Sequence, residues 1–472
     1  MKRYEALAAD IEASILNGTL SAGDKLPSVR HTGTSRGVSA TTVFKAYYLL
    51  EARGHIRAKD RSGYYVTSKS IRRLPPEAER PSTPQSESIT LDVSDQVFRI
   101  LESSMSRSVV PLGSAFPSPL LFPMERLGQA MSASMRSLDP WSTVDDLTPG
   151  HGPLRKQIAL RYLADSMSVA MDEIVVTNGA LEALNLCLAA VARPGDSVIV
   201  ESPTFYAALQ ALERLGLKAI EVPTHPRDGI DIDALEQRLK RHKPAACWLM
   251  TTFQNPLGSL MPETKKRALV ELLTRSGVPL IEDDVYAELY FGDKRPLPAK
   301  AFDTQGIVMH CSSFSKSLAP GYRVGWVSAG ARAREIARLK LTSSLGAPLP
   351  TQMAVARYLE TGAFDKHLRR LRQALEGQLA NFAHGVGHHF PSGTHATRPL
   401  GGYFMWLELP RQVNALDVHQ EALQRGISVA PGPIFSASEG FTNCMRLNFG
   451  HPWTIQIENA LKTLGNIVEA RC

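Results

Sequence analysis

Long hydrophobic runs are absent from this sequence. No stretch of about 18 uncharged apolar residues, the length that spans a membrane, occurs in its 472 residues. The N-terminal sequence MKRYEALAADIEAS is amphipathic instead of signal-like, so we expect a cytoplasmic protein with no membrane contact. Cysteine is scarce as well. The five cysteines show no C-x-x-C spacing and no paired clusters, which indicates neither a disulfide framework nor a metal site.

Acidic residues are few in the first sixth of the chain. Residues 1–73 contain 13 Lys and Arg against 6 Asp and Glu, whereas the remainder is balanced at 40 against 40. The net charge of +7 therefore belongs to the N-terminal segment. A basic segment joined to a neutral body is typical of a polyanion-binding module on a separate domain. Charge alone is equally compatible with a solvated basic face that has no function.

The chain is too long for one small domain, and the composition of one segment indicates a boundary between two domains. Residues 72–88, RRLPPEAERPSTPQSES, contain four prolines, no aromatic residue and few apolar ones. Such a composition predicts a semi-extended tether that does not pack. We therefore predict an N-terminal domain over residues 1–70, a Pro-rich linker over 71–91 and a larger domain over 92–472.

The first 70 residues show the pattern of three helices followed by a hairpin. Apolar residues recur at helical spacing over residues 4–17, and a second short helix can start near Ser28. After the turn TSRGV, Ser39 is a natural N-cap for a third helix that ends at Gly54. Residues 55–58 and 63–66 then read as two short strands around a basic tip.

This order, with the segments LPSVR and GVSATTVFKAYYLLEARG, resembles the winged helix-turn-helix of GntR-type transcription regulators. The resemblance covers roughly residues 3–68 and implies that the N-terminal part of the third helix enters the major groove of DNA. Many relatives have an arginine where this chain has Ala40. A small helical domain that contacts proteins is the alternative interpretation. The residues expected near DNA are Arg30, Ser39, Thr41, Thr42, Lys45 and Arg61.

A lysine set among small residues follows an apolar run in the second half of the chain. Ile307–Met309 reads as a buried strand, and the sequence CSSFSK would place Lys316 at its end. Burial favours the neutral amine, which can form a Schiff base with an aldehyde cofactor. Arg323, seven residues on, could hold a phosphate. The tetrapeptide S-x-S-K by itself fits a solvated lysine beside a turn equally well.

Further predicted strands, at residues 174–177, 197–201, 246–251 and 279–284, each end in a polar turn. They alternate with helical stretches, which is typical of a parallel α/β sheet. The turn at Gly179 opens a helix, and a helix start binds phosphate well. Two acids end the strand PLIEDD, and by themselves they would also fit a surface or a metal site.

SSFSK followed by APGYRVGW resembles the cofactor-lysine segment of fold-type I, pyridoxal-phosphate-dependent aminotransferases of class I/II, and the turn QNPLG and the strand MRLNFG fit the same family. The resemblance implies an α/β fold with a large parallel-rich α/β/α domain over about residues 125–335. It implies a smaller C-terminal α+β domain over about residues 340–472. It also implies a homodimer. Many relatives carry a tyrosine where this chain has Asp145 or Asp146, just before LTPGHGPLR.

The family resemblance implies a role for each matching residue. Pyridoxal 5'-phosphate would be bound to Lys316 as a Schiff base, and Arg446 would grip a substrate carboxylate. The catalytic residues would be Lys316, Asp283 at the pyridine nitrogen, and Tyr286 beside the phenolic oxygen. Phe205 would lie against the ring, with Tyr206 the alternative if the register slips by one. The remaining cofactor contacts would come from Asn255 at the phenolic oxygen and, at the phosphate, from Gly179, Ala180, Leu181, Ser313, Ser315 and Arg323.

The two resemblances together match MocR-type regulators of the GntR superfamily over nearly the whole chain. They predict a transcription regulator that binds a double-stranded DNA operator and senses a small amino compound through pyridoxal phosphate. The same residues would support transamination. A working aminotransferase with a fused DNA-binding domain, converting an amino acid to a 2-oxo acid, is therefore the alternative. A scaffold that uses neither DNA nor cofactor is a third interpretation.

Overall fold

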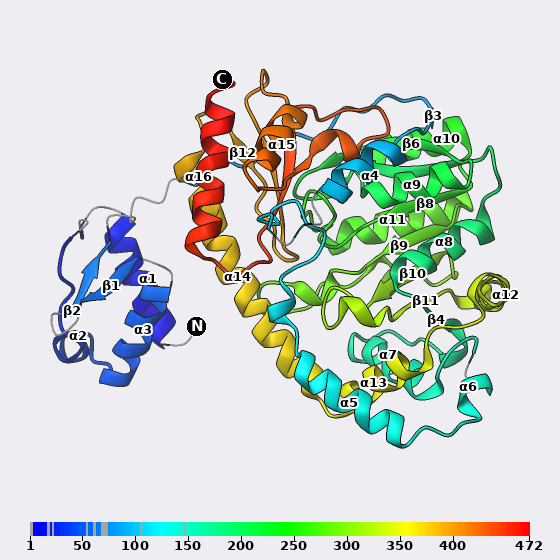
Figure 1. The fold of residues 1–472 in the computed structure, drawn as a ribbon, viewed down its shortest axis with the longest axis horizontal. Coiled ribbons are helices and arrows are strands. Elements are labelled where there is room, and N and C mark those ends of the chain that lie inside the picture. Colours follow the sequence, from blue (N-terminus) through cyan, green and yellow to red (C-terminus); the bar gives the residue numbers. More distant parts are fainter. Residues whose placement is uncertain are drawn as a thin grey trace. The chain divides into compact units, whose positions relative to one another are not determined.

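A computed structural model describes most of the chain, namely residues 3–16, 19–20, 23–52, 55–59, 63–67, 74–103, 106, 108–145 and 147–472 (Figure 1). The chain divides into two compact units. One contains Met1–Pro75 with Leu379–His389, and the other contains Pro76–Gln378 with Phe390–Cys472. Among the described residues, no helix has the length and apolar character needed to cross a membrane.

The N-terminal segment is the predicted sequence of three helices and a hairpin. Ser28 caps the second helix by accepting the N–H of His31 at 3.2 Å, and the helix ends at Gly37, whose φ of 63° only a few residue types adopt readily. Ser39 accepts the N–H of Thr42 at 3.2 Å and so begins the third helix. The elements are α1 (Arg3–Leu16), α2 (Val29–Arg36), α3 (Ala40–Ala52), β1 (Ile56–Lys59) and β2 (Gly63–Val66).

One hydrophobic core holds these elements together. Leu7 and Ile11 of α1 pack with Val43 and Leu50 of α3, and Ile56 of the hairpin closes the cluster. The antiparallel hairpin pairs Ile56 with Val66. Burial of this apolar stripe is what fixes the helices, because helices this short are marginal alone. The winged helix-turn-helix predicted from the sequence is confirmed.

The larger unit is built on a mostly parallel sheet. Its strands follow the order β3-β6-β5-β8-β9-β10-β11-β4, in which β6, β5, β8, β9 and β10 run parallel and β11 runs antiparallel to both its neighbours. The strands are β3 (Ile89–Thr90), β4 (Ile174–Thr177), β5 (Ser197–Ser202), β6 (Lys218–His225), β7 (Gly229–Ile230, paired with β6), β8 (Ala246–Leu249), β9 (Leu280–Asp283), β10 (Val308–Ser313) and β11 (Gly325–Ser328).

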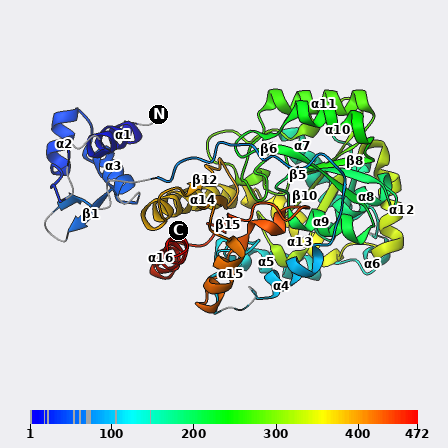
Figure 2. The same ribbon diagram turned by 90° about the horizontal axis from the view of Figure 1, so that it is seen from above.

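Helices cover both faces of this sheet, as Figure 2 shows for α10 and α11 on one side and α8 and α9 on the other. Both faces are therefore buried, which explains the continuous apolar runs of the strands. The helices of this part are α4 (Ser94–Ser103), α5 (Met124–Arg136), α6 (Ser142–Asp145), α7 (Gly152–Ala164), α8 (Ala180–Val191), α9 (Tyr206–Arg214), α10 (Ile232–His242), α11 (Glu263–Ser276), α12 (Ala333–Ser344), α13 (Leu349–Glu360) and, as far as Gln378, the long α14 (Ala363–His389).

The C-terminal part forms a second, antiparallel sheet with the order β12-β13-β15-β14. Its central pair, β13 and β15, places Phe404 opposite Asn448 and Trp406 opposite Arg446. The predicted fold class, a winged helix joined to a large parallel-rich α/β/α domain and a smaller α+β domain, is confirmed. The elements are β12 (His395–Ala396), β13 (Phe404–Glu408), α15 (Ala415–Gln424), β14 (Ala430–Pro431), β15 (Cys444–Asn448) and α16 (Ile455–Glu469).

The Pro-rich segment differs from its prediction. We expected residues 72–88, within the predicted linker 71–91, not to pack, but from Pro76 onward the segment belongs to the larger unit. The Ala78 N–H donates to the Ala396 carbonyl at 3.1 Å, the Ser82 hydroxyl accepts the Thr224 N–H at 3.0 Å, and β3 pairs with the edge strand β6. The expectation was wrong because it considered only the packing of apolar side chains and left out hydrogen bonds of the backbone. An extended, proline-stiffened backbone loses little entropy on ordering and satisfies an open sheet edge.

Candidate functional site

The motifs singled out in the sequence lie at one edge of the large sheet. The turns that follow β5, β8 and β10 carry Phe205, Asn255 and Lys316, and Asp283 is the last residue of β9. Carboxyl ends of parallel strands meet at the same edge, which is where α/β sheets bind ligands. The fold therefore gathers residues that are more than 100 positions apart in the chain.

Lys316 is held where a charged amine is unfavourable. Its Nζ donates to the Ala115 carbonyl at 2.8 Å and lies 3.7 Å from the centre of the Phe116 ring. Burial, reinforced by Arg446 and Arg323 and opposed by Asp283, lowers the pKa of Lys316 to about 7. A large neutral fraction at neutral pH makes this lysine a nucleophile toward an aldehyde.

Asp283 ends β9 and is almost fully buried. Burial, with a smaller contribution from Asp284, raises the pKa of Asp283 to about 7, and Lys316 acts against this rise. Its neighbour Asp284 is paired, since one of its oxygens lies 3.0 Å from His310 Nε2. Within the described part of the chain, Asp283 Oδ1 is buried without a hydrogen-bond partner. Such an orphaned acceptor fits the protonated nitrogen of a ring.

Asn255 and Arg446 form a buried pair beside these residues. Arg446 donates from Nη1 to Asn255 Oδ1 at 2.8 Å and from Nη2 to the Gly113 carbonyl at 2.8 Å, and its guanidinium lies 4.0 Å from the Phe404 ring centre. Asn255 Nδ2 has no hydrogen-bond partner among the described residues, so a donor is left over. Tyr286 lies edge-on to Phe404, and burial raises the pKa of the Tyr286 hydroxyl.

The opposite end of the site is an anion cradle at the start of α8. Gly179 precedes this helix with φ 84° and ψ 170°, and a Cβ there would collide with the Arg323 guanidinium. Arg323 donates to Ser315 Oγ at 3.3 Å and to the Asn178 carbonyl at 3.0 Å, while Ser313 Oγ accepts the Ser315 N–H. The first-turn N–H groups of α8, including those of Ala180 and Leu181, have no partners within the helix. Backbone donors and an arginine together suit a phosphate.

The two aromatic residues after β5 differ in their surroundings. Tyr206 is buried against Phe435, whereas Phe205 is only partly buried, with its ring 4.9 Å from that of Tyr206. This arrangement favours Phe205 over Tyr206 as the residue that meets a bound ring. Asp145 is exposed at the end of α6, and Asp146 lies outside the described residues.

Two families match the two parts of this chain. Residues 146–464 match the family described as aminotransferase class I and II, and residues 3–66 match the bacterial regulatory proteins of the gntR family. The HTH-type transcriptional regulator YdcR of Escherichia coli, itself uncharacterized, is 45% identical over 471 residues, which is 100% of both chains. The chain belongs to the gntR-type transcriptional regulators that carry a class I and II aminotransferase domain. The MocR-type architecture predicted from the sequence is confirmed.

Solved aminotransferases share the fold of the larger part. A multiple substrate aminotransferase from Thermococcus profundus is 26% identical with a TM-score of 0.74, over 80% of this chain and 95% of its own. LysN of Thermus thermophilus, an α-aminoadipate aminotransferase solved with N-(5'-phosphopyridoxyl)-L-leucine, is 29% identical with a TM-score of 0.74, over 81% of this chain and 96% of its own. Membership of this family implies use of pyridoxal phosphate, and the orphaned Asp283 oxygen and the cradle at Gly179 fit that group.

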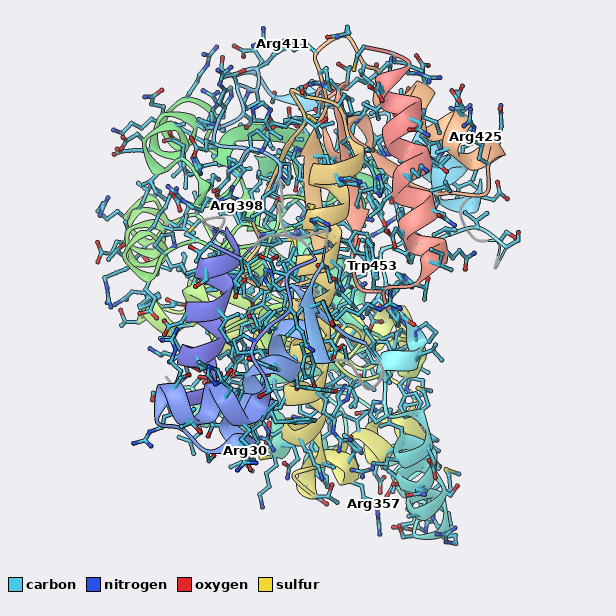
Figure 3. All side chains as sticks on the ribbon, turned by 90° about the vertical axis from the view of Figure 1, so that its left-hand side faces the viewer. Arg30, Arg357, Arg398, Arg411, Arg425 and Trp453 are labelled. Carbon is cyan, nitrogen blue, oxygen red and sulfur yellow. The ribbon has the colours of Figure 1, made fainter. Side chains whose placement is uncertain are left out.

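Four of the predicted DNA-contacting residues lie in the second and third helices of this gntR-type domain, and Ser39 directly precedes the third helix. Arg30 on α2 is exposed, and Figure 3 labels its side chain at the surface of this domain. Thr41 and Lys45 are exposed on α3. Ser39 and Thr42 bond to each other through their hydroxyl oxygens at 2.8 Å and cap the helix. Arg61 lies outside the described residues.

Sequence reasoning missed two features of the site. The first is the segment 113–116, whose carbonyl oxygens hold both Lys316 and Arg446. The second is Glu201, which is buried at the end of β5 and accepts the Met250 N–H at 3.0 Å. Burial raises the pKa of Glu201 to about 8, with a contribution from Asp283. For Glu201, the sequence signal was a single acidic residue inside the apolar strand that precedes SPTFY. For the segment 113–116 there was no sequence signal, because every residue has a backbone carbonyl.

Proposed function

We propose that this DNA-binding regulator senses a small amino compound through pyridoxal phosphate held by Lys316. The observation that carries the proposal is one arrangement: a lysine whose pKa is lowered to about 7, next to a buried carboxyl with an unpaired oxygen. Neither group has a use in a purely structural domain, because each costs stability as it stands. The gntR-type domain on the same chain supplies the output, which is binding of a double-stranded DNA operator.

Each part of the site has a distinct task in this proposal. When bound, pyridoxal phosphate supplies an aldehyde that condenses with amines and a ring that accepts electrons. Lys316 Nζ would hold it, Asp283 Oδ1 would accept the hydrogen bond of the ring nitrogen, and Asn255 Nδ2 with Tyr286 would face the phenolic oxygen. The N-terminus of α8, with Ser313, Ser315 and Arg323, would bind the phosphate.

The effector in this proposal carries a carboxylate as well as an amine. Arg446 is fully buried and donates to the carbonyls of Gly113 and Ser114, at 2.8 and 3.2 Å. A carboxylate would offer this guanidinium a charge-assisted, bidentate pair in place of two neutral acceptors. The exchange would release the segment 113–116, so an amino acid would favour a different arrangement of this segment. That differential contact is what a sensor needs.

A homodimer is part of the same proposal. Exposed apolar side chains gather at α6 and α12, and Trp141 retains 72% of its surface exposed. A monomer gains nothing by exposing them, so an interface that covers them is expected. Besides Trp141, the exposed apolar side chains at these two helices are Val144, Leu341 and Leu345.

A Lys316→Ala variant tests the cofactor assignment. The purified wild-type protein is expected to show the visible absorbance of Lys316-bound pyridoxal phosphate, and the variant is expected to lose it. Lys240→Ala is the matched control, because this lysine is exposed and pairs with Glu236 one helical turn away. Retention of the absorbance in Lys316→Ala would contradict the assignment.

A gel shift separates the sensor from the alternative enzyme. Binding to operator DNA that changes with an added amino acid supports the regulator. Rapid formation of 2-oxo acid from the same amino acid, with no DNA binding, would favour a working aminotransferase. That alternative has support from the 2-aminoadipate transaminase of Thermus thermophilus, which is 31% identical over 78% of this chain and 92% of its own.

A further inference from the structure

The outward face of α3 carries unusual side chains for a solvated helix. Phe44 and Tyr48, one helical turn apart, keep 54% and 67% of their surfaces exposed. The opposite face, which includes Val43 and Tyr47, is fully buried in the core of the N-terminal domain. The exposed aromatic residues therefore do not serve the fold of this domain.

The start of this face is mostly apolar: it has no asparagine or glutamine that would read adenine, and Lys45 is its one side chain of the type that reads guanine. Ala40, Thr41 and Phe44 are exposed on the first two turns, and Lys45 is the only cation among residues 40–52. Guanine is read mostly by arginine or lysine and adenine by asparagine or glutamine. Alanine, the threonine methyl and phenylalanine instead contact the 5-methyl group of thymine, the apolar feature of the major groove.

We propose that α3 reads the 5-methyl groups of thymine through Phe44, with Ala40 and Thr41 beside it. The inference rests on the proposed DNA-binding function and names what this domain recognises: a half-site with thymine where α3 enters the groove. DNA fits this face better than a protein partner does. Lys45 lies next to Phe44 in the same helix, Arg30 is exposed on α2, and the segment holds the entire positive excess of the chain.

Uracil substitution tests the proposal, because uracil pairs as thymine does but lacks the methyl group. Duplexes are first selected from a random-sequence pool with the full-length protein. Each thymine of the selected site is then replaced by uracil in turn, and affinities are measured at one fixed salt concentration. We expect the wild-type affinity to fall about fourfold at one or more positions, the factor for losing one buried methyl group. Phe44→Ala should lose the uracil effect at the position that Phe44 reads.

Two control variants sharpen the result. Phe98→Ala removes a phenylalanine of similar exposure, 62% against 54%, from α4, outside the N-terminal domain, and should keep the full uracil effect. Lys45→Gln should weaken both duplexes by the same factor and reduce the salt slope by about 1. Because Phe44 is exposed, its variants should keep the wild-type circular dichroism, and Phe44→Leu should keep part of the uracil effect.

Three outcomes would overturn the inference. The wild-type protein could be indifferent to uracil at every position, or Phe44→Ala could retain the whole uracil effect. Phe44→Ala could also change the sedimentation mass without changing DNA recognition, which would make this face a protein contact. Failure to enrich any duplex would instead overturn the DNA-binding proposal itself, so the two failures are distinguishable.

Discussion

Lys316 and Asp283 are each driven toward neutrality by burial, although each also favours the charge of the other. Burial is the larger cause in both cases, and it brings the pKa of the amine down and that of the carboxyl up to about 7. In the proposed function, both side chains would change protonation readily on binding pyridoxal phosphate, Lys316 at the aldehyde and Asp283 at the ring nitrogen. Asp284, one residue on, is stabilised by His310 and is left outside this exchange.

At the residue scale we predict that Lys316 reacts with small amine-directed reagents at unusually low pH. Its ordinary pKa of 10.5 falls to about 7, so reductive methylation of cofactor-free protein should reach half its maximum near pH 7. Peptide mass spectrometry measures the labelling of each lysine over a pH range on both sides of the shifted pKa of about 7. The exposed Lys240 gives the comparison.

The lowered pKa of Lys316 also predicts how the stability of the protein depends on pH. Between about pH 7 and 10.5 the unfolded chain binds more protons at Lys316 than the folded chain does, so the contribution of this lysine to stability rises with pH. Lys316→Met should therefore stabilise the cofactor-free protein most at the low end of this window.

In the labelling experiment, methylation of Lys316 that begins at no lower pH than that of Lys240 would contradict the environment assigned to Lys316.

At the scale of elements, the start of α8 depends on a backbone conformation that glycine alone adopts readily. Gly179→Ala would drive a Cβ into the Arg323 guanidinium in a strained region of φ and ψ. We predict a loss of about 1–3 kcal/mol in stability, the usual cost of such strain. We also predict a fall of at least about tenfold in affinity for pyridoxal phosphate, equivalent to one displaced charge-assisted hydrogen bond. Fluorescence titration and thermal unfolding measure the two effects.

Gly377→Ala is the matched control for this substitution. Gly377 lies inside α14, and a Cβ added there would have nothing within 4 Å. Alanine should therefore raise stability by about 0.5–1 kcal/mol and leave cofactor affinity unchanged. Wild-type affinity in Gly179→Ala would show that the turn before α8 does not bind the phosphate.

At the scale of the whole molecule, the Pro-rich segment belongs partly to the larger unit. We predict that a chain of residues 76–472 unfolds at a higher temperature than one of residues 92–472. The shorter chain loses the pairing of β3 with β6 and the bonds of Ser82 and Ala78, which leaves a sheet edge open. Differential scanning calorimetry compares the two chains. Equal unfolding temperatures would mean that the segment adds nothing to the fold.

The sequence by itself determined the elements of this protein and the residues from which its chemistry is inferred. Helix caps such as Ser28 and Ser39, the apolar stripes of α1 and α3, and the strand-turn pattern before Lys316 are local signals that act within a few residues. The matching motifs then placed Asp283, Asn255 and Lys316 at neighbouring strand ends, because a parallel sheet brings its carboxyl ends together.

Only the tertiary structure decided which groups meet at the site. The contact of Lys316 with the Ala115 carbonyl joins residues 201 positions apart, and that of Arg446 with Gly113 joins residues 333 apart. Backbone carbonyls carry no residue-specific signal in a sequence. The packing of residues 76–91 depends likewise on a sheet edge formed elsewhere in the chain. Burial, which sets the pKa of Lys316 and of Asp283, is a property of the folded chain as a whole.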